Sequence, residues 1–237
     1  MAAIAHQSAA AGKVYAAERK ALDERPRLPR RTDQVPRTEV QLGGFGGQGI
    51  MSAARIIGQA AAIYDGLEAC FTQSYGPEAR GGAAGSQVII SSDPIHHPHL
   101  IEPTSMIIMS QGAYAKYVPS LAAGGVLLID GGLVDLPESH RTDITTHCIP
   151  ATHMAEQAGS ARAANTAMLG CWNAIAGIVS KEAMRHAVAE SVPAKMVDMN
   201  LRVFEAGYAE GMRLKADQGG SQDAQPTAGL PAGGGQA

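Results

Sequence analysis

A glycine-rich turn near the start of the body constrains the fold more than any other part of the chain. The stretch Thr38–Leu42 predicts a short strand, and the run Ile50–Tyr64 has the apolar spacing of a helix. The sequence GGFGGQG at 43–49 joins the two. A strand, a glycine turn and a helix in this order predict an α/β fold in which the turn can meet an anion at the helix N-terminus.

The turn has the spacing Gly44-x-Gly46-x-x-Gly49 that is typical of dinucleotide sites. Its candidate ligand-binding residues are Gly44, Gly46, Gly47, Gln48 and Gly49. A dinucleotide site also needs an acid at the end of the second strand, where this chain has Gln73 and Ser74, and no Walker lysine follows the glycines. Three interpretations stay open: a nucleotide held by this turn alone, a phosphate or pyrophosphate site shared with another chain, and a structural turn against a partner.

A second concentration of polar chemistry lies in the loop Ser74–Gly82, with the sequence SYGPEARGG. Its candidate ligand-binding side chains are Tyr75, Glu78 and Arg80. A loop that follows a strand of a parallel sheet emerges at the carboxyl edge, where ligands bind. Arg80 has the forked geometry that pairs with a phosphate or a carboxylate. The alternative is an ion pair of Arg80 with Glu78 or across an interface.

The rest of the body alternates apolar strands with helices and then becomes helical. Further strands are predicted at Leu67–Thr72, Ser86–Ser91, Met106–Met109, Gly125–Asp130 and Ile144–Ile149. Helices are predicted at Gln111–Leu121, Thr152–Ala158, Arg162–Val179, Lys181–Glu190 and from Pro193 onward. We therefore expect an α/β fold, Rossmann-like, with a mostly parallel (mixed) sheet, helices on both faces and a C-terminal helical segment.

Charge and composition divide the chain into three parts. Residues 1–37 carry eight basic and four acidic side chains, whereas the remainder carries 11 basic and 18 acidic ones. We expect residues 1–37 to form a basic arm that is either mobile or docks on a partner subunit. Residues 38–216 form the domain, and residues 217–237, rich in Gly, Ala and Gln, are expected to be disordered.

Several site classes find no support in the residues. The three cysteines, Cys70, Cys148 and Cys171, are too few for an iron–sulfur cluster and lack the paired spacing of structural zinc. His96, His97 and His99 are most simply a solvated loop, and Asp130-Gly131-Gly132 is a strand-end turn without the rest of a thiamine motif. We therefore predict no metal site and no complete set of catalytic residues within this chain.

Composition also limits partners and location. A net charge of −3 and 4% aromatic residues argue against a nucleic-acid binder. No window approaches 18 uninterrupted apolar residues, and we expect no membrane span. The odd cysteine count and the lack of a secretory pattern lead us to expect a cytoplasmic protein with free thiols.

Five segments together carry a family resemblance that extends over about Thr38–Gly211. They resemble the gamma subunit of 2-oxoacid:acceptor oxidoreductases, a group that includes the 2-oxoglutarate, 2-oxoisovalerate and pyruvate:ferredoxin oxidoreductases. GGQG with YGPEARGG is the most specific pair. The five segments are Gly43–Ile50 (GGFGGQGI), Ser74–Gly82, Ser86–Ser91, Asn165–Gly170 (NTAMLG) and Asn200–Tyr208 (NLRVFEAGY).

The resemblance implies one subunit of a larger enzyme. In the family, thiamine diphosphate with magnesium decarboxylates the 2-oxoacid, [4Fe–4S] clusters carry electrons to ferredoxin or another acceptor, and coenzyme A takes the acyl group. These cofactors are held by the partner alpha and beta subunits, with a delta or ferredoxin-like subunit as a further candidate. The glycine turn and Arg80 are then expected to approach coenzyme A phosphates or the thiamine-binding partner. We expect 2-oxoglutarate as substrate, followed by a branched-chain or aromatic 2-oxoacid.

Two other functions compete with this interpretation. One is a stand-alone, Rossmann-type NAD(P)-dependent oxidoreductase, and the other is a nucleotide-binding regulatory module. The missing acid after the second strand counts against the first, and the loop Ser74–Gly82, which a simple dinucleotide domain does not need, counts against both. The family interpretation predicts that the isolated chain is inactive.

Overall fold

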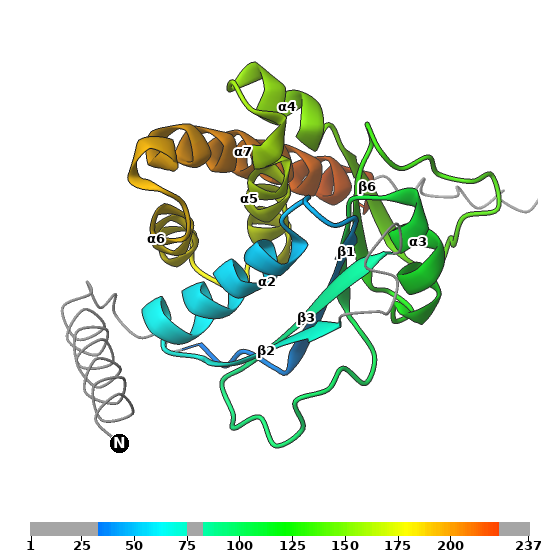
Figure 1. The fold of residues 1–237 in the computed structure, drawn as a ribbon. Coiled ribbons are helices and arrows are strands. Elements are labelled where there is room, and N and C mark those ends of the chain that lie inside the picture. The colour runs from blue at the N-terminus through cyan, green and yellow to red at the C-terminus, as the bar shows by residue number, and fades with distance from the viewer. Residues whose placement is uncertain (1–32, 75–82, 223–237) are drawn as a thin grey trace, which may run out of the picture.

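The computed structural model describes residues 33–74 and 83–222, which form a six-stranded sheet covered by helices (Figure 1). The strand order is β2-β3-β1-β4-β5-β6. The strands are β1 Thr38–Gly44, β2 Glu68–Ser74, β3 Ala84–Ser91, β4 Ser105–Ile108, β5 Val126–Asp130 and β6 Thr145–Ile149. The predicted α/β fold with a mixed sheet is confirmed.

The sheet is parallel except around β3. Strand β1 pairs in parallel with β4, β4 with β5, and β5 with β6. Strand β3 lies antiparallel to both β1 and β2, so β2 runs in the same direction as β1. The reversal follows from the short connection between β2 and β3: residues 75–83 are too few for the crossover that parallel neighbours need, so β3 runs antiparallel to β2.

Helices cover both faces of the sheet, as predicted. In Figure 1, α3 lies on one face, and α2, α5 and α6 lie on the other, with α7 packed on the outer side of α5. The α-helices are α2 Ile50–Gln59, α3 Gln111–Tyr117, α4 Ala151–Gln157, α5 Ala164–Ala176, α6 Lys181–Ser191 and α7 Val197–Gln222. A π-helical turn, Ala60–Tyr64, follows α2, and 3₁₀ turns occupy Val118–Ser120, Ala161–Ala163 and Ala194–Met196.

The continuous apolar runs of the central strands reflect burial on both faces. In β4, Ile107 belongs to the large core beneath α2 and α5, whereas Met106 and Ile108 belong to a smaller core beneath α3. In β5, Leu128 faces the large core and its neighbours face the small one. Both faces of these strands are buried, which explains why their sequences are unbroken runs of hydrophobic residues.

Local chemistry fixes the helix ends. Ser180 caps α6: its Oγ accepts a hydrogen bond from the Ala183 amide (3.2 Å) and donates one to the buried Asp65 carboxylate (2.6 Å). Helix α5 ends before Gly177, which adopts φ +63°, so the predicted helix Arg162–Val179 is shorter than expected.

Helices α5 and α7 approach each other through glycine. A Cβ atom on Gly207 would lie 2.1 Å from the carbonyl oxygen of Ala167, and one on Gly170 would lie 2.2 Å from that of Phe204. The closest contact of α7 with α5 therefore uses Gly207 and Gly211, whereas Met212 is exposed. Trp172 is fully buried, and its Nε1 donates to Ser105 Oγ (2.9 Å).

The described part of the chain extends past one predicted boundary. Helix α7 continues to Gln222, so the boundary at residue 217 falls within its last turns, where Arg213 bonds Asp217 one turn on (2.8 Å). The arm at 1–32 and residues 223–237 lie outside the described residues. None of the helices in the described ranges combines the length and apolar character that a bilayer crossing requires.

Candidate functional site

The carboxyl edge of the sheet brings the two predicted loops to one place. The glycine turn connects β1 to α2 at this edge. In the register, Gly44 pairs with Ala84 and Ser74 pairs with Gly85, so both ends of the segment 75–83 are anchored beside the glycine turn. Tyr75, Glu78 and Arg80 themselves lie outside the described residues, and their roles stay predictions.

Gln48 shapes the turn from within. Its Oε1 accepts a hydrogen bond from the Phe45 amide (2.6 Å), and its Nε2 donates to the Met109 carbonyl at the end of β4 (2.7 Å). A Cβ on Gly44 would lie 2.5 Å from Gln48 Oε1, so Gly44 makes room for this side chain. Because the amide group of Gln48 is used at both ends, the side chain supports the turn, and its predicted contact with a ligand stays a prediction.

The remaining glycines of the turn divide into open and closed positions. Gly46 and Gly47 are exposed, and a Cβ on either would meet no atom within 4 Å. Gly47 has φ +94°, a conformation that favours glycine. Gly49 has φ +75° and precedes α2, whose first turn holds no acidic residue among its side chains. The partial positive charge of this helix end is therefore available to an anion.

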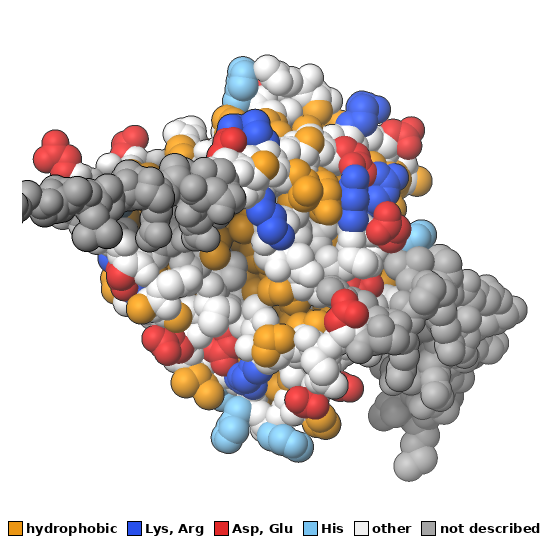
Figure 2. Space-filling view, turned by 180° about the vertical axis from the view of Figure 1, so that it is seen from behind, with side chains coloured by type: hydrophobic (Ala, Val, Ile, Leu, Met, Phe, Trp, Pro, Cys, Tyr) orange, Lys and Arg blue, Asp and Glu red, His pale blue; other side chains and the backbone are white. Residues whose placement is uncertain are grey.

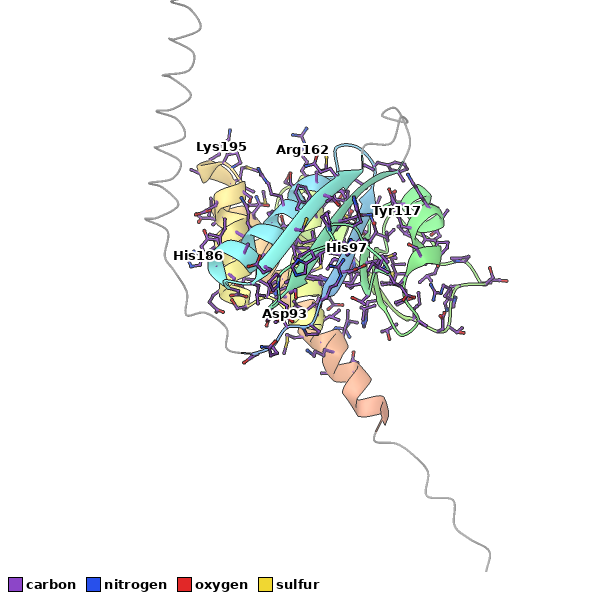
Figure 3. All side chains as sticks on the ribbon, turned by 90° about the horizontal axis from the view of Figure 1, so that it is seen from below. Asp93, His97, Tyr117, Arg162, His186 and Lys195 are labelled. Carbon is purple, nitrogen blue, oxygen red and sulfur yellow. The ribbon has the colours of Figure 1, made fainter. Side chains whose placement is uncertain are left out.

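A pocket of about 240 Å³ lies beside the turn and contains one cationic residue. Gly47, Gln48, Met109, Leu133 and Arg162 line it together with Thr152, Ala161 and Ala164. Arg162 is exposed and projects from the same margin of the molecule as Lys195 (Figure 3). Sequence reasoning missed Arg162, which it placed only at the start of a helix, because no local pattern signals that this residue faces the turn.

The Asp130 carboxylate, which is bonded to the pocket residue Thr152, is held by hydrogen bonds within the chain. Asp130 ends β5 and is fully buried, with Oδ2 accepting from the Thr152 hydroxyl (2.6 Å) and Oδ1 accepting from the amide of Gly132 (3.2 Å). The amides of Leu133 and Val134 both donate to its carbonyl oxygen (2.9 Å each). The predicted strand-end turn is confirmed, and hydrogen bonds within the chain engage both oxygens of the Asp130 carboxylate.

Apolar side chains surround the same edge. Six large hydrophobic residues are exposed in the described part of the chain, and four of them belong to the loops and helix start at this edge: Phe45 (43%), Met51 (40%), Leu133 (43%) and Leu136 (39%). Gln111 holds the last of these loops, because its Oε1 accepts from the Asp135 amide (2.9 Å). An exposed apolar rim around a polar turn is typical of a surface that another protein covers.

The histidine loop between β3 and β4 has a different character. Arg37 fastens it to the sheet by donating to the carbonyls of His97 (3.1 Å) and His99 (3.0 Å), and the side chains of His96, His97 and His99 are exposed. Figure 2 shows histidines projecting from the lower margin of the molecule. Over the described ranges, no group of three or more His, Cys, Asp or Glu side chains is arranged to hold a metal ion.

Two buried groups with altered pKa values, His147 and Cys171, lie away from the edge. Burial lowers the pKa of His147 on β6 below its ordinary value. Burial, with a smaller effect of Glu210, raises the pKa of Cys171 on α5 to about 12, so this thiol is inert. At the edge itself, the described residues supply backbone amide donors and one arginine, a combination that suits anion binding.

Comparisons with known proteins agree with one another. A family model for pyruvate ferredoxin/flavodoxin oxidoreductase matches residues 39–210. A 2-oxoglutarate synthase subunit, KorC, from Methanocaldococcus jannaschii is 47% identical over 173 residues, which cover 73% of this chain and 92% of that protein. A ketoisovalerate oxidoreductase subunit, VorA, from Methanothermobacter thermautotrophicus is 33% identical over 178 residues, covering 73% of this chain and 36% of that protein.

A solved structure extends the agreement to the fold. The gamma subunit of a keto/oxoacid ferredoxin oxidoreductase from Geobacter sulfurreducens PCA superposes with a TM-score of 0.67 at 38% identity. The match covers 74% of this chain and 99% of that one. The part of the present chain that the comparison leaves unmatched is about a quarter of its length.

Proposed function

The chain belongs to the pyruvate ferredoxin/flavodoxin oxidoreductase family, and from this premise we propose that it is the gamma subunit of a 2-oxoglutarate:ferredoxin oxidoreductase. The observation that carries the proposal is the 47% identity to a 2-oxoglutarate synthase subunit over 92% of that protein. The enzyme oxidatively decarboxylates the 2-oxoacid, forms the acyl-CoA and passes electrons to ferredoxin or a similar acceptor.

The choice of 2-oxoglutarate rests on relative similarity, since the ketoisovalerate subunit is 33% identical. We expect the assembled enzyme to use 2-oxoglutarate with a kcat/KM at least tenfold above that for 2-oxoisovalerate. Reduction of a ferredoxin or viologen acceptor, followed spectrophotometrically with each acid and coenzyme A, checks this. A preference for 2-oxoisovalerate would contradict the assignment of 2-oxoglutarate as substrate, although the family assignment would still hold.

The cofactors of the reaction fit partner subunits better than this chain. Iron–sulfur clusters need clustered thiolates, and the described residues hold no group of three or more His, Cys, Asp or Glu side chains that could hold a metal. We therefore assign thiamine diphosphate, magnesium and [4Fe–4S] clusters to the alpha and beta subunits, with a delta or ferredoxin-like subunit as a further partner. The exposed apolar rim at the glycine edge supports docking on such a partner.

The glycine edge itself is proposed to hold an anionic part of the reaction, the phosphates of coenzyme A. Gly46 and Gly47 leave room for a close approach, and the uncompensated N-terminus of α2 and Arg162 supply positive charge. Arg80, on the loop anchored beside this turn, is a second candidate cation. When coenzyme A is bound, its thiol takes the acyl group, and this chain binds and orients it.

Substituting Gly47 by Asp in the assembled enzyme tests this assignment. We expect Gly47→Asp to raise the KM for coenzyme A at least tenfold, since it places a carboxylate and a strained backbone at the open face of the turn. Gly124→Asp is a matched control, because Gly124 also has a positive φ (+74°) and open surroundings but precedes β5, at the other end of the strands.

Arg162→Ala and Arg80→Ala are expected to raise the same KM by about three- to tenfold each, the loss of one charge-assisted contact. If Gly47→Asp leaves the KM for coenzyme A unchanged in the assembled enzyme, the turn is only a contact with a partner subunit.

The arm at 1–37 stays a proposed docking segment, and deletion of residues 1–36 should weaken co-purification with the electron-transfer partner.

A further inference from the structure

Two sequence motifs that are far apart in the chain meet directly behind the glycine turn. Asn165 and Thr166 begin the segment NTAMLG on α5, and Asn200 begins NLRVFEAGY on α7. The Thr166 hydroxyl donates to Asn200 Oδ1 at 3.0 Å and lies 3.4 Å from Asn165 Oδ1. Thr166 and Asn200 are 3% and 6% exposed, so this contact is made out of water.

Asn165 connects this pair to the turn. Its Nδ2 donates to the carbonyl oxygen of Gly49 (3.3 Å), the same oxygen that accepts the first helical hydrogen bond of α2 from the Ala53 amide (2.8 Å). A Cβ on Gly49 would lie 2.4 Å from Asn165 Nδ2. The asparagine amide thus lies against the one residue that sets the direction of the turn as it enters the helix.

The other end of the connection is held by the backbone of the last helices. Asn200 Nδ2 donates to the Met196 carbonyl in the turn that precedes α7 (2.9 Å). Helix α5 cannot slide on α7, because Gly170 and Gly207 bring their backbones into direct contact. Asn165 therefore contacts the turn from helix α5, whose position is fixed by its packing on α7.

We propose that Asn165, which lies beside the buried Thr166–Asn200 pair, is a positioning residue that fixes the carbonyl of Gly49 and so holds the amides of the glycine turn in the geometry that binds an anion. The anion is the phosphate of coenzyme A, which rests on the proposed function. Gln48 fastens the start of the turn to β4, and Asn165 fastens its end to α5. A turn held at both ends loses less freedom on binding and so binds more tightly.

The chain offers a matched control on the same helix. Asn173 is 2% exposed, and its Nδ2 donates to the Val179 carbonyl (2.6 Å) beyond the end of α5. Replacing Asn173 removes a buried amide from α5 without touching the turn. Loss of stability alone is therefore common to Asn165→Ala and Asn173→Ala, whereas loosening of the turn is expected only of Asn165→Ala.

The test uses the assembled enzyme and two readouts, amide hydrogen exchange in the peptide 44–53 and the kinetic constants for coenzyme A. We expect Asn165→Ala to speed exchange in this peptide and to raise the KM for coenzyme A about fivefold, with kcat within twofold of wild type. Asn165→Asp should raise KM further, because it adds a negative charge beside the anion. Thr166→Val should have the same effects as Asn165→Ala in weaker form, and Asn173→Ala should leave both readouts unchanged.

The outcomes separate this proposal from the proposed function. Exchange in peptide 44–53 that is the same in Asn165→Ala as in Asn173→Ala would overturn the positioning role. Faster exchange with an unchanged KM, together with an unchanged KM in Gly47→Asp, would keep the positioning role and remove coenzyme A from the turn. If Asn165→Ala does not assemble, Thr166→Val gives the same two readouts with a side chain of equal size.

Discussion

Glycine serves opposite purposes in two regions of this molecule. At the carboxyl edge, a Cβ on Gly46 or Gly47 would meet nothing within 4 Å, whereas between α5 and α7 a Cβ on Gly207 would lie 2.1 Å from a backbone oxygen. In the first region glycine allows a positive φ and leaves open space in which an anion can approach the backbone. In the second it removes the last space between two helices. Sequence alone does not separate the two uses, and they predict different consequences of mutation.

The largest effect is expected for Gly207→Ala. The added methyl group would overlap the Ala167 carbonyl of a fixed helix, so α5 and α7 must separate and expose their shared core. We expect a loss of about 3 kcal/mol or more in the free energy of unfolding. Urea denaturation followed by circular dichroism measures it, and wild-type stability in this variant would show that the helices are not in backbone contact.

Gln48→Ala should have the next largest effect and act on the open region. It removes the bonds to the Phe45 amide and to the carbonyl of the buried Met109. Leaving the part-buried Met109 carbonyl unpaired costs about 1–3 kcal/mol, whereas water can bond the exposed Phe45 amide. The same denaturation experiment checks this, and faster amide exchange limited to residues 44–50 would distinguish a loosened turn from a general loss of stability.

Gly58→Ala is expected to be favourable, which makes it a control for the first substitution. A Cβ at this position of α2 meets Phe71 Cβ at 3.8 Å, an ordinary contact, and alanine is the better helix former. A gain of about 0.5–1 kcal/mol is expected. A loss comparable to that of Gly207→Ala would mean that any methyl group in these helices is harmful, and the contrast between regions would disappear.

The smallest effect concerns pH. Burial lowers the pKa of His147 in the folded chain below its ordinary value of 6.5. The unfolded chain then binds the proton at a higher pH than the folded one, so stability falls as the pH drops through 6.5 toward the folded pKa. His147→Gln should lose less stability between pH 7.5 and pH 5 than wild type does. An equal loss in both proteins would assign the acid sensitivity to other groups.

Much of the fold could be predicted because it is encoded locally. Alternation of apolar strands and helices identified β1, α2 and β5 within two residues of their ends, apart from the π-helical turn that continues α2. Helix α6, predicted at Lys181–Glu190, ends one residue later, at Ser191. The placement of β3 beside β1 could not be predicted, since that pairing joins residues 40 or more positions apart in the chain.

The candidate site was predicted in part. The turn at 44–49 was visible from its glycines, and the anchoring of the second loop beside it followed from the carboxyl-edge rule. Arg162 and the contact of Asn165 with Gly49 could not be predicted, because residues more than a hundred positions apart meet only through the packing of α5. The close contact at Gly207 could not be predicted either, because it depends on the backbone of Ala167, which meets Gly207 only in the folded chain.

Purification of the tagged full chain from cells that make the whole enzyme tests the central claim most directly. Native mass spectrometry, with iron and thiamine diphosphate determined on the same sample, gives the composition of what accompanies it. We predict a complex with additional subunits that carry both cofactors, while the chain released from that complex is free of them and does not turn over substrate. A lone 24.5 kDa protein that transfers hydride from NAD(P)H, or that binds thiamine diphosphate or iron stoichiometrically by itself, would contradict the account.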